Sequence, residues 1–269
     1  MPRVPGYTEP VWRVLRNLRA PDRIQPHSNP DRDSDKDTML TRKNLIQAVA
    51  LLLAVFGLRS AHAADARDRV LRQLDAASAR FHTTSAQFEF DTVTTEPIPD
   101  TDRQKGTVYY ERNGSSFRMA AHIEEQNGKK SPKMYVYSGG SIKLYEPLID
   151  QVTTLQKLSQ YESWFMLGFG ASGKELEKKW EIKYLGSDIL EGKKAEKLEM
   201  VAKDPAVRKN IVKVQMWVDP ETGISLKQVF DQGAGQYRVS VYFNIQVNQP
   251  LPGDAFTLKT TKKTVFVNR

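Results

Sequence analysis

The strongest constraint on the fold is a run of short alternating segments separated by glycine turns. Phe88 and Phe90 alternate with polar neighbours, and apolar side chains alternate again over 117–123. A period of two residues is typical of strands with one buried face. Asn-Gly and Gly-Gly pairs favour tight hairpin turns, and three follow in succession: Asn113-Gly114, Asn127-Gly128 and Gly139-Gly140. Because these connections are short, neighbouring strands are expected to run antiparallel.

The remaining chain predicts more strands and few helices. Apolar residues three or four apart over 70–81 predict an amphipathic helix before the first strand. Residues 155–167 combine helical spacing with dense apolarity, and 174–179 predict a short polar helix. Further strands are expected over 107–112, 134–137, 142–145, 180–185, 195–201, 211–218, 224–230 and 237–247. The expected class is α+β, with a mostly antiparallel sheet, an N-terminal helix and a helical insertion in mid-chain.

Residues 39–63 have the three parts of a secretory signal peptide. A basic opening at Met39 precedes a run of 14 mainly apolar residues over 45–58, and Ala61 and Ala63 follow at the positions read by signal peptidase. A spanning helix needs about 20 apolar residues, so we expect cleavage after Ala63. Proline-rich residues 1–38 are then either an overlong gene assignment or a disordered segment. The alternative is a cytoplasmic tail before an uncleaved anchor.

Charge and composition narrow the function. The first 63 residues hold ten of the 40 basic and six of the 32 acidic residues, so the formal net charge falls from +8 to +4 without them. That weakens a nucleic-acid role, and export makes ATP- or NAD-dependent chemistry unexpected. The absence of cysteine excludes disulfides and thiol nucleophiles.

The motifs of enzymes are weak in this chain. Residues 168–173 match G-x-G-x-x-G, but a helical segment precedes them where a dinucleotide site needs a strand, so we interpret them as a hinge. His82 and His122 are the only histidines after Ala63 and lack metal-ligand spacing. There is no G-x-S-x-G elbow. We expect no catalytic residue, no metal and no cofactor, and therefore not an enzyme.

Aromatic residues and methionines crowd the stretch from Phe88 to Phe169. An ordinary hydrophobic core explains each of them singly. The sharper interpretation is a sheet wrapped around an apolar cavity and closed by residues 155–169, since both faces of several strands carry rings. Methionine suits such a cavity because it adapts to varied ligand shapes. Four strand residues are cavity candidates on this ground: Phe88, Phe90, Val136 and Leu144.

The segment from Met134 to Val152 resembles the LolA family of periplasmic lipoprotein carriers. It combines a strand, the Gly139-Gly140 turn, a second strand and a Tyr145-Glu146-Pro147 segment ending in Gln151. Residues 106–117 resemble the family's hairpin, 164–167 its apolar lid helix, and 243–256 its closing strand. The likeness covers essentially the whole chain after Ala63.

This resemblance implies a half-open, mostly antiparallel β-barrel over 64–269, closed by an N-terminal helix and a mid-chain lid. It implies a monomeric periplasmic carrier that holds lipoprotein acyl chains, is loaded by an ATP-driven inner-membrane complex and is unloaded by an outer-membrane receptor. Arg112 matches the arginine that latches the lid. Seven residues match cavity or lid positions: Tyr109, Phe117, Met119, Leu148, Trp164, Phe165 and Met166.

Three departures leave the cargo open. Asn113-Gly114 replaces the family's proline, Met119 replaces an aromatic residue, and the regions 173–200 and 204–210 are longer and more charged. The alternative functions are a lipid- or lipoprotein-sensing module of the envelope and, more remotely, a secreted hydrolase. No partner protein can be named from the sequence, and a nucleic-acid partner is not expected.

Overall fold

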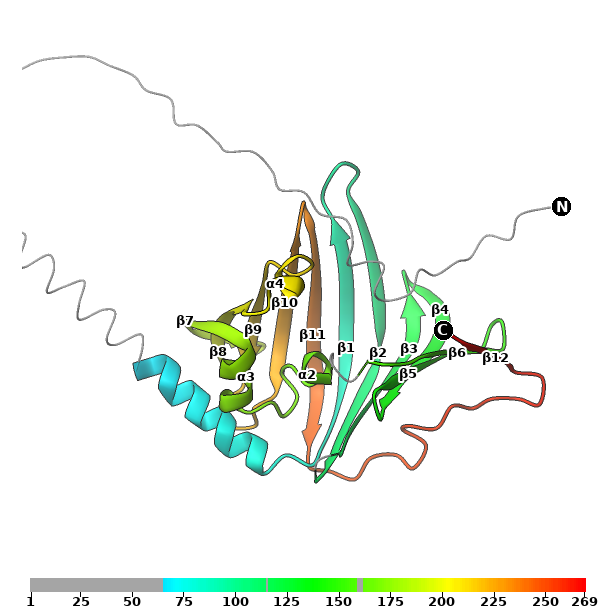
Figure 1. Ribbon diagram of the computed structural model, residues 1–269, viewed down its shortest axis with the longest axis horizontal. Helices are drawn as coiled ribbons and strands as arrows, with labels where there is room; N and C mark the ends of the chain where they lie inside the picture. Colours follow the sequence, from blue (N-terminus) through cyan, green and yellow to red (C-terminus); the bar gives the residue numbers. More distant parts are fainter. Residues whose placement is uncertain (1–64, 115, 159–161) are drawn as a thin grey trace, which may run out of the picture.

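The computed structural model describes residues 65–114, 116–158 and 162–269. The expected signal peptide and residues 1–38 lie outside the described residues. The described strands form one twelve-stranded sheet in the order β12-β6-β5-β4-β3-β2-β1-β11-β10-β9-β8-β7 (Figure 1). The strands are β1 (Thr83–Thr94), β2 (Asp100–Asn113), β3 (Ser116–Gln126), β4 (Lys129–Ser138), β5 (Ser141–Glu146), β6 (Gln151–Leu155), β7 (Trp180–Leu190), β8 (Lys193–Ala202), β9 (Lys213–Val218), β10 (Ser225–Gly233), β11 (Gln236–Val247) and β12 (Val265–Asn268).

The sheet consists of two antiparallel meanders joined at their long strands. β1 to β6 form one meander, β7 to β11 form the other, and β11 returns to pair with β1. Every pair of neighbours is antiparallel except β12 with β6, which run parallel. The sheet is not closed, because β12 and β7 each have a single neighbour. The expected half-open, mostly antiparallel architecture is confirmed.

Glycine turns fix the hairpin registers, as the sequence predicts. Asn127 and Gly128 both have positive φ, 53° and 74°, in the turn between β3 and β4. Positive φ at both central residues is the type I′ geometry whose twist matches that of paired strands. The same kind of turn, at Gly139 and Gly140, joins β4 to β5.

Helices lie on the inner face of the curved sheet (Figure 1). The N-terminal helix, described over residues 65–79, buries Val70, Leu71 and Leu74 against β7, β8 and β9. Three short helices follow in the chain: α2 (Glu162–Phe165), α3 (Gly173–Lys179) and α4 (Pro205–Arg208). The expected helix over 155–167 is wrong in extent, because Leu155 belongs to β6 and α2 is a single turn.

Alternation along the strands divides the core between the two faces of the sheet. We call the inner group around β1 to β4 the aromatic cluster: Phe81, Ala86, Phe88, Val108, Tyr110, Phe117, Ile123, Tyr137, Ile142, Phe169 and Ile224. The helix-side cluster gathers the N-terminal helix, α3 and β7 to β9 around Leu198, Met200 and Val214. The outer cluster lies on the opposite face: Ala120, Met134, Val136, Tyr145 and Val152, with Tyr109, Phe256 and Leu258 packed against it.

Candidate functional site

Residues 162–173 form a plug, here called the lid, between the two inner clusters. Phe165 and Met166 pack against the aromatic cluster, whereas Trp164 and Leu167 pack with the helix-side cluster. Phe169 stacks on Tyr110 with ring centroids 4.0 Å apart and meets Tyr242 edge-on at 4.8 Å. The lid therefore joins the two inner clusters into one continuous apolar interior.

The interior that the lid covers is desolvated. Burial raises the pKa of Tyr110 well above its ordinary value. Burial likewise raises the pKa of Tyr242 to about 12. Neutral phenols in a poorly solvated environment resist ionisation because the charged form loses its water. An interior of this kind favours an uncharged chain over a charged ligand.

A few hydrogen bonds attach the lid to the sheet. The side-chain amide of Gln228 donates to the Leu167 carbonyl at 2.6 Å, and the Ser225 backbone N–H donates to the Gly168 carbonyl at 2.7 Å. The Tyr137 hydroxyl donates to the Glu162 carboxylate at 2.6 Å. The first two bonds contribute about 0.5–1.5 kcal/mol each and the bond to the Glu162 carboxylate about 1.5–3 kcal/mol. Together they position the lid against the sheet.

Arg112, at the end of β2, joins three separate elements. Its Nη1 donates to the Ser78 hydroxyl of the N-terminal helix at 3.1 Å, and its Nη2 donates to the Gly170 carbonyl of the lid at 2.8 Å. The Ser78 hydroxyl also donates to the Gly170 carbonyl, at 2.7 Å. The guanidinium lies 5.5 Å from the centroid of the Phe81 ring, within cation–π range. The fork geometry of arginine suits such a junction.

The glycines of the G-x-G-x-x-G segment are required by close packing. Gly170 has φ +81°, and a Cβ on it would lie 2.5 Å from the Phe81 ring. α2 precedes the segment where a dinucleotide fingerprint needs a strand. The segment therefore serves to bring the lid backbone against Phe81 and Arg112.

The structure brings most of the predicted cavity residues together. Six of them belong to or pack against the aromatic cluster: Phe88, Phe90, Phe117, Met119, Phe165 and Met166. Trp164 packs against the adjoining helix-side cluster. Leu144 is half-buried and pairs across the strands with Tyr135, which also packs against the aromatic cluster.

Three predicted residues lie elsewhere. Tyr109 and Val136 belong to the outer cluster, because strand alternation turns them away from Tyr110 and Tyr137. Leu148 is 74% exposed in the turn between β5 and β6. The hairpin register could have excluded Tyr109, since Tyr110 is the residue that pairs with Met119. Sequence reasoning also missed Ser78 as a partner of Arg112, because no local pattern marks a hydroxyl of one helix that meets a distant loop.

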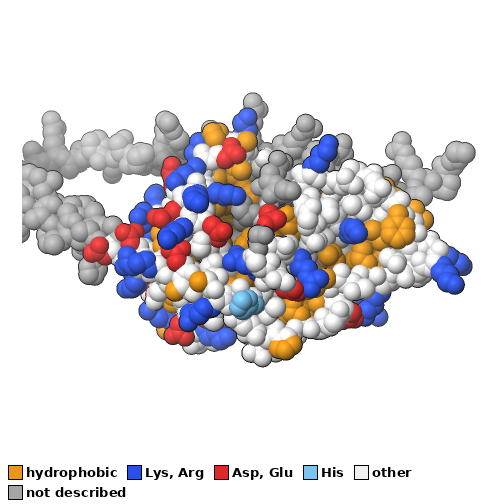
Figure 2. Space-filling model, turned by 60° about the horizontal axis from the view of Figure 1, so that its bottom comes forward, with side chains coloured by type: hydrophobic (Ala, Val, Ile, Leu, Met, Phe, Trp, Pro, Cys, Tyr) orange, Lys and Arg blue, Asp and Glu red, His pale blue; other side chains and the backbone are white. Residues whose placement is uncertain are grey.

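Exposed apolar side chains gather near the turn that holds Leu148. Leu148, Ile149, Val265 and Phe266 are each more than half exposed, in the β5–β6 turn and in β12. Figure 2 shows charged side chains crowded at the end occupied by the N-terminal helix and apolar ones exposed toward the opposite end. These residues lie away from the lid.

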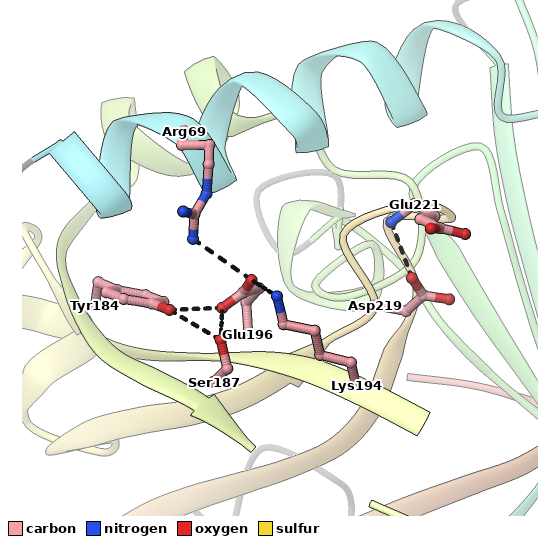
Figure 3. A network of polar contacts seen from close by, with 7 residues as sticks. All are labelled: Arg69, Tyr184, Ser187, Lys194, Glu196, Asp219 and Glu221. Carbon is pink, nitrogen blue, oxygen red and sulfur yellow. Dashed lines mark hydrogen bonds and ion pairs between the residues drawn. The ribbon is translucent and has the colours of Figure 1, made fainter. Parts of the chain in front are cut away.

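A buried carboxylate fixes the N-terminal helix (Figure 3). Glu196 of β8 is 2% exposed and accepts hydrogen bonds from the Tyr184 and Ser187 hydroxyls, each at 2.7 Å. Lys194 lies 3.3 Å and Arg69 of the helix 3.6 Å from its other oxygen. Burial would raise the pKa of this carboxyl, but the hydrogen bonds from Tyr184, Ser187 and Lys194 lower it below its ordinary value. Glu196 thus stays ionised and ties the helix to the β7–β8 hairpin.

Within residues 65–114, 116–158 and 162–269, no group of three or more His, Asp or Glu side chains is arranged to hold a metal ion. His122 contacts the Ala255 carbonyl at 2.9 Å and fastens the C-terminal segment to the outer face. No helix in the described part of the chain has the length and apolarity to cross a membrane.

Comparison with known proteins gives matches among solved structures alone. No protein-family profile and no curated protein matches the chain. An uncharacterized conserved protein from Thermus thermophilus matches with TM-score 0.48 and 12% identity over 75% of this chain and 98% of the other. A LolA superfamily protein from Nitrosomonas europaea matches with TM-score 0.35 and 14% identity over 70% and 96%.

The expected LolA resemblance agrees with the presence of a LolA superfamily protein among the matched structures. A complex of MucA and MucB from Pseudomonas aeruginosa also matches, with TM-score 0.43 and 15% identity, over 72% of this chain and 61% of the other. At these identities the likeness concerns the fold alone.

Proposed function

We propose that the protein is a periplasmic carrier that binds the acyl chains of a lipoprotein or related lipid beneath the lid, without covalent chemistry. The observation that carries the proposal is the lid itself. Its apolar side chains occupy the aromatic cluster, yet a few hydrogen bonds and one arginine hold its backbone in place. A segment held in this way can leave when a better apolar occupant arrives.

The exchange of lid for ligand sets the affinity. Burying each CH₂ of an acyl chain contributes about 0.8 kcal/mol. Opening the lid exposes Phe165 and Met166 and breaks the Arg112 bonds, so the net affinity is the difference between the two sets of contacts. This difference keeps binding reversible, which a carrier that hands its cargo to a partner requires.

Localisation and partners complete the proposal. Export through the signal peptide expected over residues 39–63 delivers the carrier to the periplasm. A donor complex at the inner membrane and a receptor at the outer membrane supply and remove the cargo. The sensing function remains the second candidate, and it would use the same interior.

The test is to produce the full chain in its host, purify the exported protein and analyse it by native mass spectrometry with lipid extraction. We expect an acylated molecule in stoichiometric amount, and displacement of a fluorescent acyl probe by that molecule. An empty protein that also fails to bind the probe would overturn the proposal. A bound lipid that no outer-membrane fraction can remove would favour the sensor over the carrier.

A further inference from the structure

Arg238 of β11 is a cation on the inner face of the sheet. Arg238 is four residues from Tyr242 on the same strand with no bulge between them, so both side chains lie on the same face. The ring of Tyr242 contacts Phe169 of the lid. Its cross-strand neighbours are Phe230 on β10 and Thr92 on β1. Four residues of strand place Arg238 about 13 Å from Tyr242, toward the β10–β11 turn.

Two apolar groups flank this position. Phe230 packs against the helix-side cluster. Phe90, two residues before Thr92 on the same strand and opposite Ser240, packs against the aromatic cluster. In Figure 1 the β10–β11 turn and the tip of the β1–β2 hairpin share one end of the sheet, away from α2. Arg238 therefore lies between the apolar interior and that end of the sheet.

The guanidinium of Arg238 is poorly solvated. Its Nε is buried and finds no hydrogen-bond partner within the described residues. Burial lowers the pKa of Arg238, and no charged group in the described part of the chain offsets that effect. A buried guanidinium nitrogen without a hydrogen-bond partner is costly, and arginine remains protonated under all ordinary conditions.

The nearest carboxylate on the same face of the sheet is already engaged, whereas Asp91 and Asp231 pair with Val239 and Tyr237 and so lie on the opposite face. Asp102 of β2 pairs with Thr92, two strands from Arg238. Its Oδ1 accepts from the side-chain amides of Gln126 at 2.8 Å and Asn127 at 2.9 Å. Two strand spacings amount to about 9.6 Å. Asp102 is therefore bonded to its amide donors and does not pair with Arg238.

We propose that Arg238 binds the anionic head group of an acylated ligand, a carboxylate or a phosphate, while the acyl chain lies along β11 toward the lid. The proposal rests on the carrier function above, since the same interior takes the chain. It adds a ligand class: single-chain lipids with a negative head at one end. Guanidinium pairs with both oxyanions through two parallel N–H donors.

The experiment is competitive displacement of a neutral fluorescent acyl probe from the exported protein by three lipids with one oleoyl chain: oleic acid, lysophosphatidic acid and monoolein. We expect the two anionic lipids to bind about tenfold or more tightly than monoolein, as a charge-assisted pair in a desolvated site requires. The better of the two identifies the head group as carboxylate or phosphate.

Variants assign that preference to Arg238. Arg238→Gln should remove the preference and keep monoolein binding, and Arg238→Met should do the same while retaining the apolar stem. Arg103→Gln is the control, since Arg103 pairs with Asp91 at 2.7 Å and is half exposed on the same sheet. Thermal unfolding of each variant confirms that it folds.

The outcomes separate the two proposals. If the wild type binds the probe but does not distinguish the three lipids, or if both Arg238 variants keep the preference, the head-group site is wrong and the carrier stands. If the wild type binds no acyl lipid, the carrier function fails, and the head-group site fails with it.

Discussion

The guanidinium of Arg112 and the carbonyl oxygen of Gly170 are 2.8 Å apart and 58 residues apart in sequence. This bond ties the end of β2 to the lid, and Ser78 of the N-terminal helix shares both groups. Three segments that no local pattern connects thus meet at one hydrogen-bonded junction. Its removal tests whether the lid regulates access to the interior.

Replacing Arg112 with Leu should weaken the attachment of the lid while the hydrophobic core stays packed. Hydrogen bonds to a charged group contribute about 1.5–3 kcal/mol each, and a domain of this size loses about 2–4 °C in Tm per kcal/mol. We expect a lower Tm together with faster uptake of a fluorescent acyl probe in stopped-flow mixing. Arg103→Leu, which removes an exposed ion pair, should change neither. An unchanged uptake rate in Arg112→Leu would contradict the role of Arg112 in holding the lid closed.

Gly170→Ala should destabilise the protein strongly. The new Cβ would lie 2.5 Å from the Phe81 ring at a φ of +81°, so both packing and backbone are strained. We expect a loss of about 2–4 kcal/mol in urea unfolding. Gly128→Ala is the matched control, with φ +74° but open space around it, and should cost about 1 kcal/mol. Equal losses in the two variants would show that Phe81 does not confine the lid.

Glu196→Gln should lower the free energy of unfolding at neutral pH and have a smaller effect on it in acid. The folded pKa of Glu196 lies below the unfolded value of about 4.3. Its stabilising contribution is therefore fully present above that unfolded value and is lost as the pH falls through the folded pKa. We expect the variant to be about 1–3 kcal/mol less stable at neutral pH, with the gap narrowing below pH ~4.3.

Urea unfolding of both proteins across this pH range measures the gap. Glu89→Gln is a suitable control, because Glu89 forms an exposed pair with Lys105 at 2.8 Å. A gap that stays constant with pH would mean that the buried carboxylate acts through packing and not through its charge.

Met119→Ser and Leu148→Ser should differ in ligand binding, although the sequence resemblance predicted both residues at cavity positions. Met119 packs against the aromatic cluster, and Leu148 is 74% exposed. Replacing Met119 removes apolar contact surface, so we expect about tenfold weaker binding of an acyl probe. Leu148→Ser should bind as the wild type does. The reverse ranking, read by fluorescence titration, would place the acyl chain outside the lid.

Local patterns predicted the hairpins well, because turn and strand preferences act over a few residues. Asn127-Gly128 and Gly139-Gly140 form the expected turns, and Ser172 with Glu175 caps the expected polar helix α3. The strand β6 was not predicted, because its five residues are short and mostly polar. In the sheet it lies between β5 and β12. Its parallel pairing with β12 joins residues more than 100 positions apart, which alternation alone cannot predict.

The packing of the predicted site residues could be inferred in outline and not in detail. Crowded aromatic residues indicated the interior, but the prediction chose Tyr109 and Val136, which face the outer cluster, in place of Tyr110 and Tyr137. Register decides the face, and register depends on contacts between strands. Arg238 was not singled out, because an arginine in an alternating strand is usually a solvated residue and its burial comes from distant elements.

The lid alternates its side chains between two clusters, and this has a thermodynamic consequence. Trp164 and Leu167 belong with one cluster while Phe165 and Met166 pack against the other, all within one turn of chain. Withdrawing the lid from either cluster withdraws it from both. Under the proposed carrier function, the interior then opens in a single cooperative step, and short and long acyl chains meet the same initial cost. Selectivity for chain length would arise only afterwards, from how much of the vacated surface each chain covers.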